Sequence, residues 1–327
     1  MQWIQNREIV MNKPVLSLEE VSVSFGSKDP IAVTDRVSFE IFPGEFFALV
    51  GESGCGKSVT AMSILRLLPT PSAKIISGRI LFDDRDLTRL TDAEIRRIRG
   101  SSISCIFQEP MQALNPVLTI GKQLLEVLRH EKKDAAMDRI KKYLKLAGLS
   151  DIDRIWKAYP HEMSGGMLQR ICIVMALLPS PSLIIADEPT TALDVTVQAQ
   201  IMDVLKRLSQ ESNTAVLLIT HNMGLVAQYA CRVGVMYAGR LVEMGPVDQV
   251  IHSPKHPYTK GLLAAIPEGH TGVQSITSIP GNVPDPKDFV EGCRFSNRCS
   301  FYKKECDAYP PKQGNDEHYA YCIKTDN

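Results

Sequence analysis

The sequence predicts an α/β fold built around a parallel sheet. The apolar run 46–50 leads directly into residues 51–58, which match the pattern G-x-x-x-x-G-K-[ST] that joins a buried strand to a helix. Two further short apolar runs, 183–186 and 215–219, have the length and composition of strands that are buried on both faces. Buried strands that alternate with helical segments are typical of a parallel sheet covered by helices.

Further strand signals surround this motif in the first hundred residues. Val21, Val23 and Phe25 alternate with serines, and residues 37–41 predict a second strand that ends at a proline-glycine turn. We therefore expect a block rich in strands and turns up to about residue 104.

The spacing of apolar residues becomes helical between about residues 107 and 178. Apolar side chains recur every three or four positions over 136–147, and Gly148 follows at a position where glycine often ends a helix. Further along, residues 267–292 contain four prolines and four glycines, which is typical of a linker. A helical insert and a C-terminal linker are thus expected.

The composition of the chain excludes some classes of protein. Its 327 residues are enough for a substantial core, and 37 basic side chains balance 37 acidic ones, so no net field favours nucleic acid. No run approaches the roughly 18 to 20 apolar residues that span a bilayer, and residues 1–13 lack the apolar stretch of an export signal. We expect an intracellular chain that does not itself cross a membrane.

The glycine-rich motif has the chemistry of a phosphate-binding loop. Its glycines let backbone N–H groups face phosphate oxygens, Lys57 adds a positive charge, and the Ser58 hydroxyl suits Mg²⁺. A glycine-rich turn in some other α/β protein is the alternative. The residues that we expect to bind ATP at this loop are Gly51, Ser53, Gly54, Cys55, Gly56, Lys57, Ser58 and Val59.

Two adjacent acids, Asp187 and Glu188, follow the apolar run 183–186. In a parallel sheet they lie at the carboxyl edge, beside the phosphate-binding loop. We expect Asp187 to support the Mg²⁺ ion held by Ser58, and Glu188 to orient and deprotonate the attacking water. His221 ends the next strand and reaches the same edge as a candidate γ-phosphate contact, with a structural histidine as the alternative.

A second helix opens with Ser164, Gly165 and Gly166. Small residues at a helix start leave N–H groups pointing outward, which makes a further anion site without a lysine. Within one chain this site has no evident use, and an ordinary glycine-rich helix start is the alternative.

Taken together and in this order, the phosphate-binding loop, the 164–166 turn and the acids at 187–188 resemble the ATP-binding cassette (ABC) family over roughly residues 15–265. The resemblance implies a P-loop NTPase with a RecA-like core, an antiparallel β subdomain and an inserted helical subdomain. The family signature reads Leu-Ser-Gly-Gly-Gln, whereas Met163 and Met167 occupy the flanking positions here. Phosphate binding by the backbone N–H groups of this turn should survive the change, although the contact that the signature glutamine would make is lost.

The resemblance divides the chain into three parts. The nucleotide-binding α/β core is expected over 14–105 and 179–265, and the helical subdomain with the signature motif over 106–178. Residues 266–327 are expected to form the linker and a small cysteine-rich extension that binds metal.

The resemblance also implies roles for single residues. Gln108 would contact Mg²⁺ and the transmembrane partner, His221 would be the switch histidine, and residues 191–194 would form the D-loop. Phe25 would stack on adenine, but because it shares a strand face with two valines, a place in the core is the alternative.

The mechanism of the family gives the second anion site a use. Two cassettes meet head to tail, so that one caps the γ-phosphate held by Lys57 of the other. Closure excludes water, and hydrolysis with Glu188 as the base releases the clamp and can drive a coupled membrane protein. The residues implied to act across this boundary are Ser164, Gly165, Gly166 and Asp194.

Residues 253–263 and 279–281, followed by a cysteine-rich tail, are similar to the ATPase subunits of dipeptide, oligopeptide and nickel importers. This branch implies an ATPase at the cytoplasmic face of the membrane that powers uptake of di- or oligopeptides. Its partners would be a second, paralogous or identical ATPase subunit, two permease subunits and an extracytoplasmic peptide-binding protein, with no nucleic acid. Uptake of nickel or another small solute is the alternative, and a soluble ABC ATPase in translation or ribosome recycling is a distant one.

Eight cysteines fall into two groups. The scattered group, which we expect to consist of small buried hydrophobes, comprises Cys55, Cys105, Cys172 and Cys231. The other group, which lies within the tail and predicts a metal site, comprises Cys293, Cys299, Cys306 and Cys322.

The spacing within the tail lacks the C-x₂₋₄-C pairs of most zinc sites and favours a [4Fe–4S] cluster, which some ATPases of this branch carry at this place. Zinc is one alternative, and thiols or disulfides are the other. Nearby basic residues would offset the charge of such a cluster or simply form a solvated face; they are Arg294, Arg298, Lys303 and Lys304.

Overall fold

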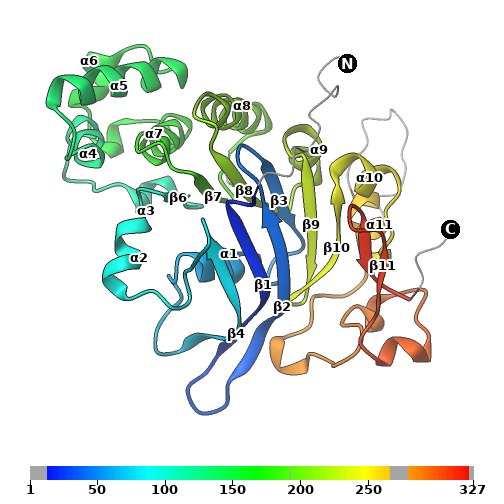
Figure 1. Cartoon of the computed structure of the whole chain (residues 1–327). Coiled ribbons are helices and arrows are strands. Elements are labelled where there is room, and N and C mark those ends of the chain that lie inside the picture. The colour runs from blue at the N-terminus through cyan, green and yellow to red at the C-terminus, as the bar shows by residue number, and fades with distance from the viewer. Residues whose placement is uncertain (1–12, 192, 266–278, 324–327) are drawn as a thin grey trace, which may run out of the picture.

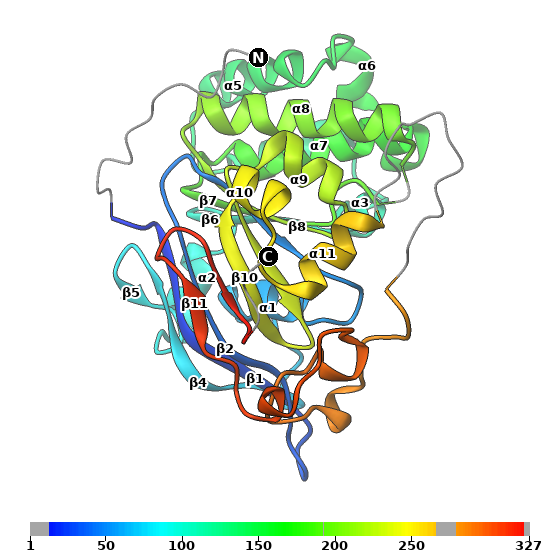
Figure 2. The same ribbon diagram turned by 90° about the vertical axis from the view of Figure 1, so that its right-hand side faces the viewer.

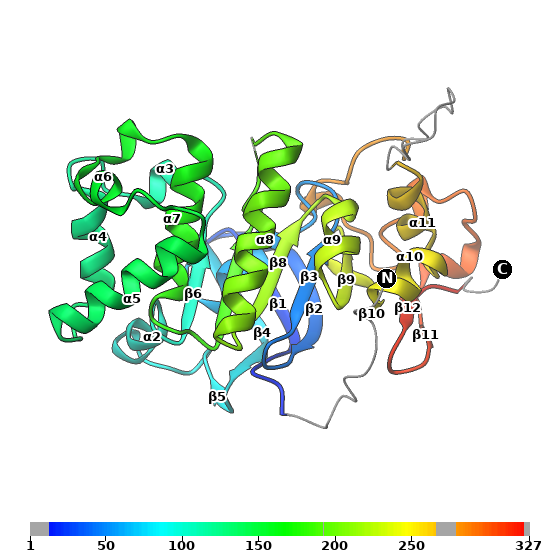
Figure 3. The ribbon, with the colours of Figure 1, turned by 90° about the horizontal axis from the view of Figure 1, so that it is seen from above.

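The computed structural model describes residues 13–191, 193–265 and 279–323, and it confirms the predicted α/β fold. Figure 1 shows an antiparallel sheet beside a larger central sheet, with a group of helices at one end and the C-terminal segment at the other. Figure 3, seen from above, separates these two ends clearly.

The smaller sheet forms the antiparallel β subdomain. Among the described residues it has four strands in the order β2-β1-β4-β5. β1 pairs antiparallel with β2 on one side and with β4 on the other. The bounds of the four strands are Leu16–Phe25 for β1, Ile31–Ile41 for β2, Ala73–Phe82 for β4 and Arg85–Asp86 for β5.

The larger sheet contains, in the part of the chain that is described, eight strands in the order β11-β12-β10-β9-β3-β8-β7-β6. Its centre, from β9 to β6, is parallel, whereas β10, β12 and β11 are antiparallel. The bounds are Phe46–Val50 for β3, Ile103–Ile106 for β6, Leu183–Asp187 for β7, Ala215–Thr220 for β8, Arg232–Tyr237 for β9, Arg240–Pro246 for β10, Lys312–Gly314 for β11 and Tyr319–Tyr321 for β12.

Both faces of the central sheet are buried, which explains the unbroken apolar runs in the sequence. In β7, Ile184 and Ala186 belong to the hydrophobic cluster beneath the helical region, whereas Leu183 and Ile185 belong to the cluster shared with the antiparallel sheet. Successive side chains of a strand point to opposite faces, so a strand between two layers must be apolar throughout.

The helical region lies between β6 and β7 in sequence and covers one end of the central sheet (Figure 1). Its helices are α3 (Pro110–Ala113), α4 (Ile120–Val127), α5 (Lys133–Leu146), α6 (Ile152–Lys157) and α7 (Gly165–Leu177). The predicted helix over 136–147 is confirmed as α5, and Gly148 follows it with φ = +76°. Such a positive φ is why glycine ends this helix.

The remaining helices connect or follow the strands of the core. They are α1 (Lys57–Ile64), α2 (Asp92–Ile98), α8 (Val195–Glu211), α9 (Met223–Tyr229), α10 (Val247–His252) and α11 (Pro257–Ala264). Short 3₁₀ turns lie at Pro160–Glu162, Pro286–Asp288, Ser296–Arg298 and Lys304–Asp307. No helix among the described residues is long and apolar enough to cross a membrane.

The C-terminal extension returns to the core instead of standing apart from it. β12 pairs antiparallel with β10 through Glu243 opposite Ala320 and Met244 opposite Tyr319. Figure 2 shows the extension, coloured orange to red, lying against the end of the β9–β10 hairpin. The last described strands thus extend the sheet that carries the phosphate-binding loop. Residues 267–278 of the predicted linker lie outside the described residues, whereas residues 279–292 are described and lead into the extension.

Candidate functional site

The phosphate-binding loop joins β3 to α1, as the sequence predicts. Gly51 has φ = +154°, and a Cβ there would lie 2.1 Å from the carbonyl oxygen of Met236. Gly56, the N-cap of α1, has φ = +101°. No other residue type fits both the backbone and the space at Gly51, so the loop can pass close to β9 only because a glycine stands there.

Lys57 begins α1, and its side chain turns back over the loop. The lysine is 5% exposed, and its Nζ donates hydrogen bonds to the carbonyl oxygens of Gly51 at 2.8 Å and Glu52 at 2.9 Å. Cys55 lies beneath it, and burial raises the pKa of the Cys55 thiol, which therefore stays neutral. The loop thus holds one buried positive charge beside its backbone amides.

The other residues predicted to bind ATP lie at different depths. Ser53 and Gly54 are exposed on the loop, whereas Val59 and Phe25 are half-buried and pack against the core cluster below the antiparallel sheet. The structure therefore gives Phe25 apolar neighbours in the core as well as a partly open ring.

Ser58 and Asp187 meet where β7 ends beside α1. The Ser58 hydroxyl donates to Asp187 Oδ1 at 3.1 Å, and Asp187 is 7% exposed. Burial, with a smaller contribution from the nearby Glu188 charge, raises the pKa of Asp187 in spite of the Ser58 hydrogen bond. A hydroxyl and a carboxylate oxygen at this distance form the kind of hard oxygen pair that Mg²⁺ prefers.

Glu188 is the centre of a polar network at the same sheet edge. Its carboxylate accepts from the Thr191 hydroxyl at 2.8 Å and from the Gln108 amide at 3.4 Å, and it lies 3.1 Å from His221 Nδ1. Although burial alone would raise it, the hydrogen bonds from Thr191 and His221 lower the pKa of Glu188. The side chain is therefore ionised at neutral pH and can accept a proton.

The structure also brings together residues that the sequence placed far apart. Gln108 follows β6, Glu188 follows β7 and His221 follows β8, and these neighbouring parallel strands end at one edge. The sequence indicates Thr191 only as part of the D-loop, and its hydrogen bond to Glu188 becomes visible only in the structure. The feature of the sequence that could have indicated this contact is that Thr191 lies three residues after Glu188.

The signature-like turn opens α7. Ser164 is the N-cap, and its hydroxyl accepts from the Met167 amide at 3.4 Å, while Gly165 begins the helix and Gly166 follows it. Asp194 caps α8 in the same way, accepting from Val197 at 3.0 Å. Among the described residues, no hydrogen bond or ion pair joins these caps to the phosphate-binding loop, and α7 and α1 lie well apart in Figure 1.

The scattered cysteines do not share one environment. Cys55 is buried as expected, whereas Cys105 and Cys172 are only half-buried, although the loss of water around their thiols raises both pKa values to about 12. Cys231 is exposed, so the expectation that all four are buried is wrong for this residue. It follows the C-terminus of α9, at the surface where the chain enters β9.

The four cysteines of the tail line a single small cavity of about 20 Å³. Burial raises the pKa of Cys293 to about 11, and the other three cysteines of the tail add to that shift. His256, which is 1% exposed, lines the same cavity, and its Nε2 has no hydrogen-bond partner. However, no group of three or more potential ligand side chains is arranged to hold a metal ion anywhere in the described part of the chain.

Phosphate-binding amides, a serine–aspartate pair and an ionised glutamate at one sheet edge supply what phosphoanhydride hydrolysis requires. The class that this fold and site define is therefore the nucleoside triphosphatases with a phosphate-binding loop.

Comparison with known proteins narrows this class. Residues 34–191 match the family model described as ABC transporter, and residues 242–306 match the model described as oligopeptide/dipeptide transporter, C-terminal region. The chain is 49% identical to the dipeptide transport ATP-binding protein DppD of Bacillus subtilis over 94% of each chain. It is 48% identical to the oligopeptide transport ATP-binding protein AppD of the same organism, over 86% of this chain and 87% of that one. The chain belongs to the ABC transporter family, among the ATP-binding proteins of its oligopeptide and dipeptide type.

A solved structure agrees with this assignment. The ATP-binding cassette MJ0796, a dimer in a post-hydrolysis state bound to ADP and Pi, superposes with a TM-score of 0.62 at 28% sequence identity. The match covers 71% of this chain and 98% of that one. The cassette therefore accounts for most of the fold described above, and the C-terminal extension is an addition to it.

Proposed function

We propose that this chain is the ATP-hydrolysing subunit of an ABC importer that takes up di- or oligopeptides. The observation that supports it most strongly is the combination of two features in one chain. An ionised Glu188 stands beside the Ser58–Asp187 pair, and the C-terminal region matches that of oligopeptide and dipeptide transporters. The first feature supports ATP hydrolysis, and the second supports the assignment to a peptide transporter.

In this proposal the phosphates of ATP lie over residues 51–58, and Lys57 exchanges its two loop carbonyls for phosphate oxygens. Ser58, Asp187 and Gln108 would hold Mg²⁺, which would neutralise part of the phosphate charge. Phe25 would contact the adenine ring from the end of β1 in the antiparallel sheet.

Glu188 would orient and deprotonate the attacking water. His221 and Thr191 hold its carboxylate in place, and their hydrogen bonds keep it ionised. His221 would contact the γ-phosphate from the same edge of the sheet. When hydrolysis removes that phosphate, His221 would lose this contact while it remains bonded to Glu188.

Completing the site requires a second cassette. Ser164, Gly165 and Gly166 present the N–H groups of an α7 helix start, and in the described part of the chain neither they nor Asp194 form a hydrogen bond or ion pair with the phosphate-binding loop. In the proposed dimer they cap the γ-phosphate bound by the other subunit. The partners would be a second ABC ATPase subunit, two membrane permeases and an extracytoplasmic peptide-binding protein, which place this chain at the cytoplasmic face of the membrane.

The test is uptake of labelled di- and tripeptides by cells that lack the gene, with uptake of a free amino acid as the control. The wild-type gene should restore peptide uptake, and the Glu188→Gln gene should not. If the chain instead sediments with ribosomes, or if peptide uptake is the same without it, the transport proposal is wrong.

We further propose that the cavity lined by Cys293, Cys299, Cys306 and Cys322 holds a [4Fe–4S] cluster. Four cysteines around one cavity and the unpartnered Nε2 of the buried His256 support this assignment. The side chains do not form a preassembled ligand cage, so they would have to rearrange around the cluster as it is inserted. When bound, the cluster would supply either cross-linking of the extension or one-electron chemistry.

Anaerobic purification followed by iron, sulfide and zinc analysis tests the cluster. We expect four irons per chain and a visible absorption that dithionite bleaches. Stoichiometric zinc, or protein without metal that folds and binds ATP normally, would contradict the cluster without affecting the transport proposal.

A further inference from the structure

Three segments beyond the phosphate-binding loop meet beside one of its residues, Glu52. Two of them contact Glu52 directly, and the other, 279–281, contacts the Arg298 side chain that binds Glu52. The first is the start of α11, which contributes Tyr258. The second is the segment 279–281, and the third is the 3₁₀ turn Ser296–Arg298 of the cysteine-rich extension. All three segments lie outside the nucleotide-binding motif at residues 51–58.

Arg298 makes the strongest of these contacts. Its guanidinium binds the Glu52 carboxylate with both terminal nitrogens, at 2.8 and 3.0 Å. The same side chain donates to the carbonyl oxygens of Pro280 at 2.8 Å and Gly281 at 3.0 Å. Only 6% of the arginine side chain is exposed, against 29% of the glutamate side chain, so the arginine side of this forked pair is shielded from water.

The charge of Arg298 is maintained despite its burial. Besides binding Glu52, the guanidinium donates to the Tyr237 hydroxyl at 3.4 Å, and an arginine side chain stays protonated in proteins. The Glu52 carboxylate is therefore always opposite a positive charge.

Tyr258 holds the backbone of the same loop residue. Its hydroxyl accepts a hydrogen bond from the Glu52 N–H at 2.8 Å. The ring is fully buried and packs on Tyr237 and Phe295, with centroids 4.6 and 5.4 Å away. The loop is thus fixed at both its main chain and its side chain by parts of the molecule outside the nucleotide motif.

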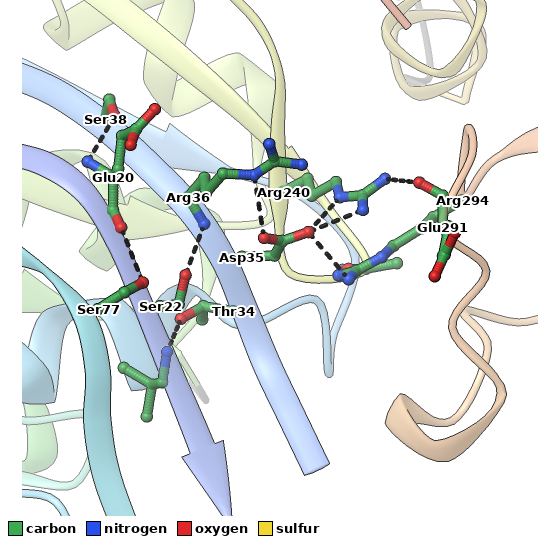
Figure 4. Close-up of polar contacts among 12 residues, drawn as sticks. Glu20, Ser22, Thr34, Asp35, Arg36, Ser38, Ser77, Arg240, Glu291 and Arg294 are labelled. Carbon is green, nitrogen blue, oxygen red and sulfur yellow. Dashed lines mark hydrogen bonds and ion pairs between the residues drawn. The ribbon is translucent and has the colours of Figure 1, made fainter. Parts of the chain in front are cut away.

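A second set of ion pairs fixes the extension on the core independently of the loop. Figure 4 shows Asp35 of β2 between Arg240 of β10 and Arg294 of the extension. The Asp35 carboxylate lies 2.7 Å from Arg240 and 3.2 Å from Arg294, and Arg240 also donates to the carbonyl oxygens of Glu291 and Gly292. Because the extension is anchored there, Arg298 reaches Glu52 from a fixed position.

We propose that the C-terminal extension positions the phosphate-binding loop, with Arg298 as the positioning residue that acts through Glu52. A carboxylate in this loop lies close to where a triphosphate must bind, and unpaired it would repel the nucleotide. Arg298 neutralises that charge and draws the carboxylate toward the 279–281 segment, while Tyr258 keeps the adjoining backbone in place. The inference rests on ATP binding and is independent of which solute is transported.

A double-mutant cycle on the full chain tests this role. The variants are Arg298→Ala, Glu52→Gln and the two together, and the readouts are equilibrium binding of a fluorescent ATP analogue and the KM and kcat of ATP hydrolysis. Arg298→Ala should weaken nucleotide binding and raise KM about tenfold, with a smaller effect on kcat. Adding Glu52→Gln to Arg298→Ala should restore most of the affinity, because it removes the unpaired charge. The single variant Arg298→Lys keeps a positive charge and should bind ATP more tightly than Arg298→Ala but less tightly than the wild type.

Lys303→Ala is the matched control, since Lys303 is an exposed basic residue of the same extension. This variant should bind the ATP analogue with the affinity of the wild type. Tyr258→Phe provides a second measure if Arg298→Ala does not fold, because it removes only the hydroxyl that accepts from Glu52. It should weaken ATP binding as well. Wild-type affinity in a folded Arg298→Ala or Tyr258→Phe, or no recovery in the double variant, would overturn the proposal and leave these contacts a purely structural role.

Discussion

Glu188 combines an unusual backbone with a well-defined side chain. Its φ of +47° lies in the left-handed region, which residues other than glycine rarely occupy, and three side chains hold its carboxylate. Strain of this kind persists where the surrounding structure compensates for it, and it is common at reacting groups. At the residue scale, the geometry therefore singles out Glu188 more clearly than its place in the sequence does.

Replacing Glu188 by Gln should lower the rate of ATP hydrolysis about 10²- to 10⁴-fold, the usual effect of removing a general base. The amide keeps the size of the side chain, so ATP binding should change little. Steady-state hydrolysis and equilibrium binding of ATP separate the two effects. Hydrolysis at the wild-type rate would remove Glu188 from the role of base.

The pH dependence of hydrolysis offers a second check at this scale. His221 is one of the groups that lower the pKa of Glu188, so the wild-type base loses its charge only at a pH below its ordinary range. In His221→Ala this support is lost, the pKa of Glu188 rises, and the acid limb of the kcat profile should move to higher pH.

Thr191→Val should move the same limb in the same direction, because it removes the other hydrogen bond that lowers this pKa. Profiles of kcat against pH for the two variants and the wild type provide the measurement. An acid limb that stays in place in both variants would show that protonation of Glu188 does not set it.

At the scale of elements, the sequence predicted what depends on local patterns. The strands at 183–186 and 215–219 and the helix over 136–147 follow from apolar spacing and were confirmed as β7, β8 and α5. The turn at Gly51 followed from its motif, since only glycine fits beside Met236. Each of these features is determined within about twenty residues of chain.

Contacts between distant segments could not be predicted in the same way. Glu52 and Arg298 are separated by 246 positions, and no periodicity connects them. Arg298 was expected either to offset a metal cluster or to face solvent, and it proves to be buried against the phosphate-binding loop. Arg294 likewise forms an ion pair, with Asp35. Lys303 and Lys304 are exposed, which agrees with the alternative of a solvated face.

The link between β10 and the C-terminal region depends on one buried acid. Glu243 is fully buried and accepts hydrogen bonds from the backbone of Lys255 and His256, while His318 Nε2 lies 2.8 Å from it. These bonds place the start of α11, and therefore Tyr258. The acid connects the sheet, α11 and the tail in a single network.

Glu243→Gln should lower the free energy of unfolding by about 1–3 kcal/mol, because the amide NH₂ would face a backbone or histidine donor that then lacks an acceptor. Urea-induced unfolding of the full chain measures this, with Glu317→Gln as an exposed control in the same tail. Equal stability of the two variants would mean that the Glu243 network does not hold the C-terminal region in place.

At the scale of the whole molecule, the residues proposed to act on ATP lie in two separate places. The loop, the Ser58–Asp187 pair and Glu188 meet at the edge of the central sheet, whereas Ser164 and Asp194 cap helices elsewhere on the surface. The sequence could suggest that these two halves belong together only through family resemblance, because the partner that would join them is a second chain.

The C-terminal extension adds a feature at this scale that a cassette alone lacks. It continues the central sheet through β12 and reaches back to the phosphate-binding loop through Arg298. If the extension positions the loop as proposed, a change in the cysteine-lined cavity should alter nucleotide binding, and nucleotide binding should reciprocally affect the extension.

The most direct measurement for the central claim is the mass of the Glu188→Gln chain with and without ATP and Mg²⁺, by sedimentation velocity over a range of protein concentrations. We expect a monomer without nucleotide and a dimer with ATP, and Ser164→Glu should abolish the dimer because it places a negative charge where the γ-phosphate binds. The same experiment with the paralogous ATPase subunit added covers a heterodimer. A chain that binds ATP but stays monomeric at every concentration, alone and with that subunit, would contradict the account.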